Sequence, residues 1–164
     1  MKKINYSEVL SALAVVIGLV FVGWELRQNT VIQRVNATQL LAAEYSDALE
    51  VMAYEGEAAC VYALGIEGLD NLNQVQRLRF FVMMFLIFRT AEQLHHYSLE
   101  GMVEPQIWRG YQRQLQEVAN LPGIREWWAV RRDWFSDMFQ AWIDDIHASG
   151  HRVQPQTYVD DYCK

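Results

Sequence analysis

The sequence VLSALAVVIGLVFVGW, residues 9–24, contains no charged residue and is bracketed by Glu8 and Glu25. This charge-free run of 16 residues is slightly shorter than the roughly 20 residues that a membrane-spanning helix needs. Tyr6 and Trp24 extend the run, because aromatic side chains at the two ends of a span lie at the level of the lipid headgroups. The distance between them is about 27 Å along a helix. Residues 1–30 are therefore predicted to hold an N-terminal tail and a single transmembrane helix.

Two other interpretations of this segment stay open. Lys2 and Lys3 followed by an apolar run are typical of a cleaved signal peptide, and a buried core helix has a similar length. The run ends in Val22-Gly23-Trp24, however, with bulky residues where a cleavage site carries small ones. We therefore expect an uncleaved anchor.

The basic residues on the two sides of the predicted span set its expected orientation. Lys2 and Lys3 lie on one side, and Arg27 and Arg34 lie on the other. Basic residues favour the cytoplasm, so the two sides are nearly balanced. Because the two lysines and the amino terminus crowd into a very short tail, we expect that tail in the cytoplasm. The rest of the chain is then expected on the periplasmic side of a bacterial inner membrane.

The remainder of the chain has a helical pattern and predicts an all-α fold. Apolar residues recur at steps of three to four residues, and no stretch alternates in the manner of a strand. Residues 31–150 are expected to form an antiparallel helical bundle of about four main helices, and residues 151–164 a polar C-terminal tail. Glycine or proline marks the breaks at 56, 101, 121–123 and 150. The expected helices cover 25–55, 57–64, 73–98, the stretch from Pro105 to the break at 121–123, and 124–148, with a turn at 65–70.

Composition excludes several classes of function. The net charge is −6 without any Lys/Arg-rich run, so no nucleic-acid partner is expected. Cys60 and Cys163 are far apart in sequence and form no CxxC pair, which excludes a cysteine zinc site and a disulfide-rich scaffold. One bridge between them stays possible in an exported domain. Glycine-rich phosphate loops and the common hydrolase motifs are absent from the sequence.

The stretch FFVMMFLIF, residues 80–88, contains nine consecutive apolar residues. Nine residues cannot cross a bilayer, and a helix that is apolar on every side must be covered on every side. We expect this stretch to be the central helix of the bundle. The alternative is that one side meets a partner subunit or the membrane surface. The candidate residues for the core or partner face are Phe80, Phe81, Met84, Phe85 and Phe88.

The stretch FRTAEQLHHYSLEG, residues 88–101, contains half of a known metal motif. Ferritin-like proteins hold two metal ions with one Glu on each of two helices and a Glu-x-x-His on each of two others. Glu92 and His95 have the latter spacing, His96 follows, and Glu44 lies on an earlier predicted helix. These four residues are the candidate metal ligands.

The candidate ligands for the other half of a ferritin-like site are unfavourably oriented. Glu117 and the pair Asp144/His147 follow in the right chain order. In one continuous last helix, however, Asp144 and His147 point away from an apolar stripe centred near Trp142, at about 100° per residue. Arg89 lies three residues before Glu92 and can pair with it. The expected role of Glu92 is therefore a polar network, and no cofactor is expected.

Tryptophans gather in the second half of the chain, and Arg131 lies among them. Its guanidinium is expected to stack on indole faces or to meet a buried carboxylate, with Glu92 and Glu44 as candidates. A side chain that only covers apolar surface is the alternative. A third hypothesis for the function is an apolar-ligand module. Its pocket is lined by Trp108, Trp127, Trp128 and Trp134.

Small residues align along one side of the predicted anchor. They recur at steps of four, three and four, which places them in one stripe about 60° wide. Helices in bilayers associate where small residues permit close backbone contact. The predicted partner is a second copy or another membrane protein, although small residues are common in membrane helices and can align by chance. The stripe consists of Ser7, Ser11, Ala14 and Gly18, and Glu25 continues it at the membrane edge.

Two stretches, VIGLVFVGWELRQNT (16–30) and LPGIREWWAVRRDWFSDMFQAWID (121–144), are similar to those of a family of small, uncharacterised bacterial proteins. The resemblance covers most of the chain. It implies one N-terminal membrane helix followed by a helical domain, and it supplies no catalytic residues. Aromatic or amide residues often occupy the place of His95 and His96 in that family, which weakens the metal hypothesis.

The sequence thus predicts a membrane-anchored helical interaction or accessory subunit of a larger membrane assembly, in contact with membrane lipid and without enzymatic activity. A ferritin-like metal-binding oxidoreductase is the alternative, and the apolar-ligand module ranks third.

Overall fold

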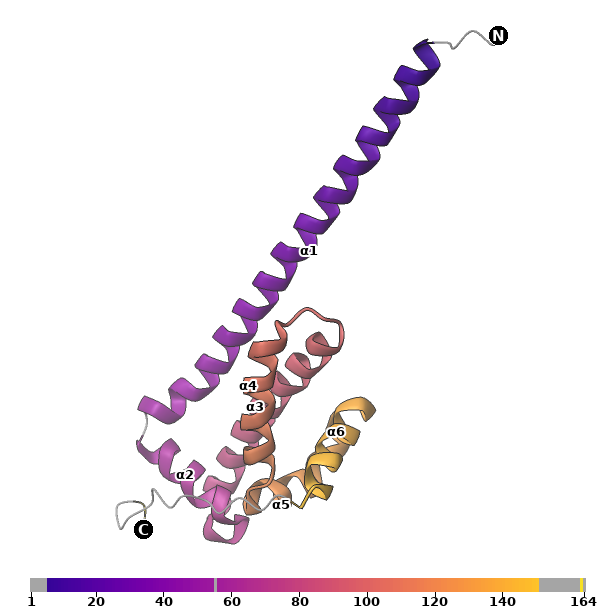
Figure 1. The fold of residues 1–164 in the computed structure, drawn as a ribbon. Coiled ribbons are helices and arrows are strands. Elements are labelled where there is room, and N and C mark those ends of the chain that lie inside the picture. The colour runs from indigo at the N-terminus through magenta and orange to yellow at the C-terminus, as the bar shows by residue number, and fades with distance from the viewer. Residues whose placement is uncertain (1–5, 55, 151–162, 164) are drawn as a thin grey trace.

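The computed structural model describes residues 6–54, 56–150 and 163. Within the first helix the described side chains are those of residues 10, 11, 13–29, 32, 36, 39, 43, 46, 47 and 50. The described chain is all-α, which confirms the predicted class (Figure 1). It contains six α-helices and two short 3₁₀ turns, more elements than the four main helices expected.

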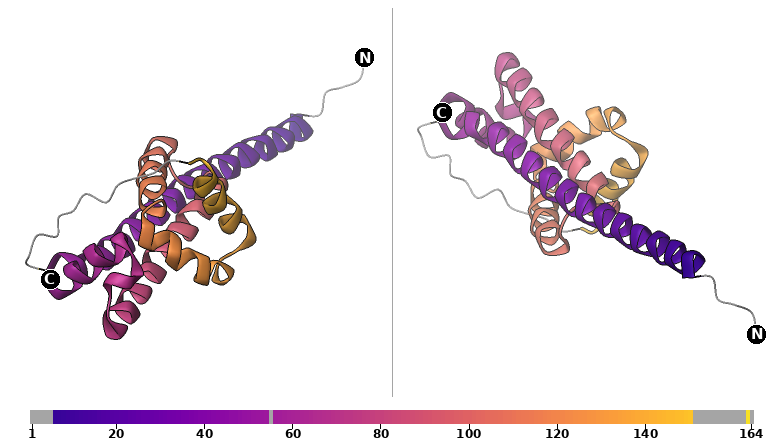
Figure 2. Two further views of the ribbon diagram at one scale, coloured as in Figure 1. Left: turned by 90° about the horizontal axis from the view of Figure 1, so that it is seen from below. Right: turned by 90° about the horizontal axis from the view of Figure 1, so that it is seen from above.

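Helix α1 (Tyr6–Tyr54) runs for 49 residues without a break. The segment of the predicted anchor and the helix expected over 25–55 therefore form one continuous helix. Its C-terminal part packs along α2 and α3, while its N-terminal part projects beyond the bundle (Figures 1 and 2). Within the described residues, no helix combines the length and the apolar character that crossing a membrane requires.

Helix α2 (Gly56–Glu67) begins at the glycine expected to end the first helix, and it runs through much of the predicted turn at 65–70. The 3₁₀ turn η1 (Leu69–Asn71) joins it to α3 (Gln74–Leu99). Asn73 and Gln76 cap α3 reciprocally, because each side chain accepts a hydrogen bond from the backbone N–H of the other. Such a capping box satisfies two backbone donors that the first turn leaves free. Gly101, with a φ of +66°, follows the end of the helix as expected.

Helix α4 (Pro105–Ala119) begins at its proline, and α5 (Pro122–Arg131) begins at the second one. Proline suits the first helical position because its missing N–H has no partner there. The start of α5 lies against the C-terminal part of α2 through two glycines. A Cβ atom on Gly123 would lie 1.7 Å from the carbonyl oxygen of Gly65. Only a residue without a side chain fits at this crossing.

The predicted single helix over 124–148 is wrong. The chain leaves α5 through η2 (Arg132–Trp134) and starts again as α6 (Asp137–Ala148). At Ser136, which precedes α6, the backbone N–H donates to the Glu92 carboxylate of α3 at 2.6 Å. The Gln140 amide donates to the Phe135 carbonyl at 2.7 Å. These bonds satisfy backbone groups that a continuous helix would have paired internally.

The core forms around the apolar side of α3, as expected for the central helix. Phe80, Met84 and Phe88 are completely buried, whereas Phe81 and Phe85 are half-buried. The ring of Phe88 lies among aromatic rings of the segments that follow α4, at centroid distances of 4.9–6.5 Å. Those rings belong to Trp127, Trp128, Phe135 and Phe139.

A disulfide joins Cys60 of α2 to Cys163, with 5.2 Å between the Cα atoms. The bridge that the sequence left open is thus present, and it fixes the C-terminal end of the chain to the second helix. No described cysteine is free.

Candidate functional site

Glu92 connects α3 to the start of α6. Its carboxylate pairs with Arg89, as expected from their spacing, and also accepts the hydrogen bond from Ser136. The second Arg89 amino group donates to the carbonyl of Trp134 at 2.9 Å. Through these contacts, Glu92 and Arg89 connect α3 to η2 and to the start of α6. Both residues line an open polar groove, together with His95 and His96.

His95 lies within aromatic packing. Its ring stacks on Trp142, with centroids 4.5 Å apart and planes 5° from parallel, and also contacts Trp108 and Phe139. Burial lowers the pKa of His95 below its ordinary value, and the neighbouring charge of His96 lowers it further, while Glu92 acts in the opposite direction. A neutral imidazole among aromatic rings is therefore the expected form near pH 7.

The candidate metal ligands do not come together in the described part of the chain. No group of three or more His, Cys, Asp or Glu side chains within it is placed to hold a metal ion. Glu92 is already committed to the contacts with Arg89 and Ser136, and His95 is buried in the aromatic packing. The side chain of Glu44 lies outside the described residues.

The expected outward orientation of Asp144 and His147 is wrong, because the break before α6 changes the rotation of this helix. Both side chains are half-buried. Asp144 accepts hydrogen bonds from Arg132, at 2.6 Å and 2.9 Å, and from the indole N–H of Trp128, at 3.2 Å. Nε2 of His147 lies 2.9 Å from the carbonyl oxygen of Ala119, at the end of α4. These contacts hold α6 against α5 and α4.

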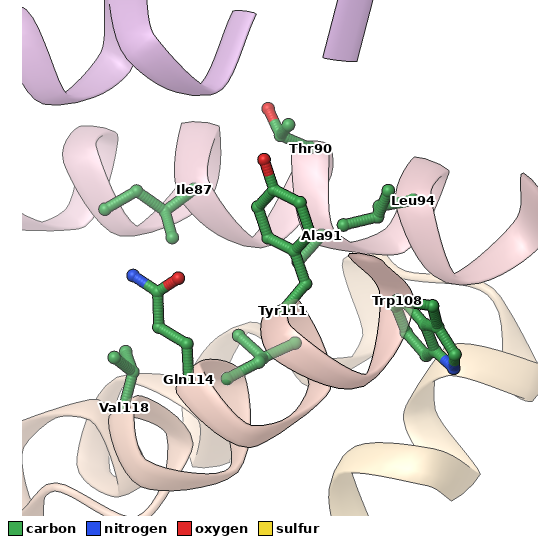
Figure 3. Close-up of a pocket in the computed structure, with 9 residues that line it drawn as sticks. Ile87, Thr90, Ala91, Leu94, Trp108, Tyr111, Gln114 and Val118 are labelled. Carbon is green, nitrogen blue, oxygen red and sulfur yellow. The ribbon is translucent and has the colours of Figure 1, made fainter. Parts of the chain in front are cut away.

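The four tryptophans proposed to line a ligand pocket are not gathered around one cavity. Trp127 and Trp128 are buried in the core, and Trp134 is 54% exposed. Trp108 lines a cavity of about 40 Å³ between α3 and α4, where Tyr111 of α4 faces Thr90 and Ala91 of α3 (Figure 3). A cavity of about 150 Å³ is needed to hold a benzene ring, so this space is too small for an aromatic ligand.

Exposed apolar side chains form a stripe on α3, on the side opposite its buried face. They follow helical steps of three, four and four residues, and 50–66% of each side chain is exposed. Apolar side chains of α5, η2 and α6 are exposed to similar extents, and the one in η2 packs against Phe85 of α3. Large exposed apolar surface is typical of binding sites. The stripe consists of Val75, Leu78, Val82 and Leu86, and the other exposed side chains are Val130, Trp134 and Met138.

The small-residue stripe of α1 lies on a part of the helix with no neighbour in the described chain. Ser11, Ala14, Gly18 and Glu25 are exposed, and a Cβ atom built on Gly18 has no atom within 4 Å. The side chain of Ser7 lies outside the described residues.

No protein-family model matches this chain, and no curated protein or solved structure is significantly similar to it. The geometry of the chain alone must therefore indicate its function.

Proposed function

We propose that this chain is a membrane-anchored helical interaction subunit, an accessory part of a larger membrane protein assembly. The observation that carries the proposal is the exposure of the N-terminal part of α1. Every side chain of residues 13–29 is exposed, although most of them are apolar. The large apolar side chains, 50–72% exposed, are Leu10, Leu13, Val15, Val16, Ile17, Leu19, Val20, Phe21, Val22, Trp24 and Leu26.

Such a helix needs an apolar surrounding. Full burial of one large apolar side chain contributes roughly 1.5–3 kcal/mol, so leaving this many side chains half-exposed in water costs on the order of 10 kcal/mol. The hydrocarbon of a lipid bilayer removes that cost, and the exposed Glu25 at the end of the run can reach the headgroups.

The disulfide supports a periplasmic position for the bundle. Disulfides persist in the periplasm and other oxidising compartments, whereas the cytosol keeps thiols reduced. Cys60 and Cys163 are bonded to each other, and both belong to the part of the chain that follows the proposed anchor. We therefore place the N-terminal tail in the cytoplasm and the bundle outside the inner membrane.

The described bundle supports a role in interaction better than a role in catalysis. The side chains with catalytic potential near the polar groove, Glu92 and His95, hold helices together or lie within aromatic packing. In contrast, α1 and α3 leave large apolar surfaces exposed in the described part of the chain. In the membrane, the proposed contact with a second copy or another membrane protein is the stripe of Ser7, Ser11, Ala14 and Gly18, continued by Glu25.

Fractionation of native-host cells tests the anchor. The chain is expected to stay with the membrane pellet after carbonate extraction at high pH, and Ile17→Lys combined with Leu13→Lys is expected to move it to the soluble fraction. Leu78→Lys, on the exposed stripe of α3, is the matched control and leaves it in the pellet. Release of the unchanged chain by carbonate would show that it is not membrane-anchored.

Purification in mild detergent tests the assembly. The chain is expected to elute with at least one other membrane protein or a second copy, and Gly18→Ile weakens this association because it prevents close helix contact. If association is unchanged by Gly18→Ile and by Ala14→Ile, the membrane contact is not made through this stripe. Stoichiometric iron or manganese that is lost on Glu92→Ala would instead favour the oxidoreductase.

The position of the bundle is tested in intact spheroplasts. After reduction with a membrane-impermeant phosphine, an impermeant maleimide is expected to label Cys60 and Cys163 without lysis. Labelling that appears only after lysis would place the bundle in the cytoplasm.

A further inference from the structure

Arg131 lies at the C-terminal end of α5 with its guanidinium between two aromatic rings. The central carbon of the guanidinium is 4.9 Å from the ring centroid of Phe81 on α3 and 4.6 Å from that of Trp134 in η2. Both distances are within the range of a cation–π contact. The stacking expected from the sequence is thus confirmed for Trp134, and Phe81 supplies the second ring.

The charge of Arg131 is incompletely compensated. No ion pair joins it to a carboxylate in the described part of the chain. Its Nε is buried and has no hydrogen-bond partner there, and one amino group donates only to the carbonyl of Val130, at 3.0 Å. The carbonyls at the end of α5 offset part of the charge. Arg89 also lies over two aromatic rings, but its charge is compensated by an ion pair with Glu92.

The surroundings of Arg131 are apolar and exposed. Val130 and Trp134 are 57% and 54% exposed. On α3, the exposed Val82 lies one helical turn before Phe85 and Leu86. The ring of Phe85 packs edge-on against Trp134 at 5.6 Å. Tryptophan and arginine are enriched among the energetically dominant residues of protein interfaces, and the aliphatic side chains around them add apolar contact area. We call this surface the Arg131 patch and define it by Val82, Leu86, Val130, Arg131 and Trp134.

The chemistry of the patch restricts its partner. A wholly apolar partner would cover Arg131 without giving it a counter-charge, and a buried unpaired charge strongly disfavours such a complex. A carboxylate in the middle of an apolar surface supplies the counter-charge and accepts hydrogen bonds from the terminal amino groups of the guanidinium. Arginine pairs with carboxylates through parallel hydrogen bonds, which fixes the orientation of the partner.

We propose that the Arg131 patch binds an amphipathic helix of another protein that presents an Asp or Glu within its apolar face. This proposal rests on the proposed function and names the partner of the bundle, in addition to any contact in the membrane. The aliphatic stripe of α3 receives the apolar residues of that helix, and Trp134 and Arg131 receive its carboxylate and the adjoining turn.

Photocrosslinking of the full chain in its native host tests the proposal. A benzoylphenylalanine at Leu86 is expected to form an adduct with a different protein, and one at Gln106, an exposed position on α4, is the control site. The crosslinked peptide is expected to have helical apolar periodicity with an acidic residue on that face. Arg131→Gln lowers the yield at least fivefold, while Arg109→Gln, a change at an exposed arginine of α4, alters it less than twofold.

The remaining variants separate charge from folding. Arg131→Lys retains the positive charge but not the parallel hydrogen bonds, so it is expected to lower the yield less than Arg131→Gln does. The loss in Arg131→Glu is expected to be restored when the partner's acidic residue is changed to Arg. An adduct with lipid or with a second copy, a crosslinked peptide without an acidic residue, or equal losses in Arg131→Gln and Arg131→Lys would overturn the proposal. Carbonate extraction of the same cells tests the anchor independently, because a failed anchor leaves the bundle and its patch intact.

Discussion

Gly123→Ala is expected to separate α5 from α2. The new Cβ atom would lie 1.7 Å from the carbonyl oxygen of Gly65 and 2.9 Å from its carbonyl carbon, whereas ordinary contacts begin near 3.4 Å. The two helices must therefore move apart by more than about 1 Å to restore ordinary van der Waals contact. Excess volume in a packed interior costs about 1–3 kcal/mol, and the upper end applies here because backbone atoms, not a flexible side chain, must yield.

Thermal unfolding in mild detergent, followed by circular dichroism, measures the effect. A loss of about 3 kcal/mol is expected to lower Tm by roughly 10 °C for a domain of this size. Gly110→Ala is the matched control, because a Cβ atom there meets nothing within 4 Å. That change lies inside α4, where alanine stabilises a helix by about 0.5–1 kcal/mol relative to glycine. If Gly123→Ala unfolds within 2 °C of the unchanged chain, the close approach of α2 and α5 is refuted.

Three further changes test other contacts. Cys60→Ser removes a bridge across 103 residues of sequence and is expected to cost about 2–4 kcal/mol in urea unfolding; an unchanged midpoint would mean that the bridge does not form. Glu92→Gln weakens the contacts with Arg89 and with the start of α6, and is expected to cost about 1–2 kcal/mol; nuclear magnetic resonance should show the loss of protection first in α6. The Arg132 guanidinium holds the pKa of Asp144 below its ordinary value of 3.8, so this pair stabilises the fold above pH 3.8 and its contribution is lost as the pH falls below that value. Asp144→Asn should therefore make stability less dependent on pH in this acid range, and an unchanged slope would argue against the pair.

The boundaries of α3 and α4 could be predicted because their signals are local. The cap of α3 involves Asn73 and Gln76, which are three residues apart, and Gly101 and Pro105 act on their own backbone. Each of these residues restricts the chain in the same way in any surrounding. Sequence reasoning is reliable where the interacting groups are this close along the chain.

The break before α6 could not be predicted from apolar periodicity. The apolar residues between 124 and 148 are compatible with one continuous helical face, and the groups that stabilise the break come from elsewhere. Glu92 reaches Ser136 across 44 residues of sequence. The pair Ser136-Asp137 was a local signal for a helix start, since serine is favoured before the first turn and an acidic residue within it.

The candidate site was predicted in part for the same reason. The pairing of Arg89 with Glu92 and the stacking of Arg131 on a nearby indole follow from short spacings, and the structure contains both. The second aromatic ring that contacts Arg131 belongs to Phe81 of α3, which lies 50 residues earlier in the sequence. That contact, like the exposed side of α3, depends on how the helices are placed together.

The bridge between Cys60 and Cys163 closes a covalent ring that contains α3, α4, α5 and α6, with α1 leaving the ring as a single arm. A peptidase that cuts once within this ring, for instance at the exposed Gly101 between α3 and α4, produces two fragments that stay linked. The nicked protein would migrate as one species on a non-reducing gel and as two after reduction. Damage by a single cleavage therefore leaves the C-terminal half of the bundle attached to α1.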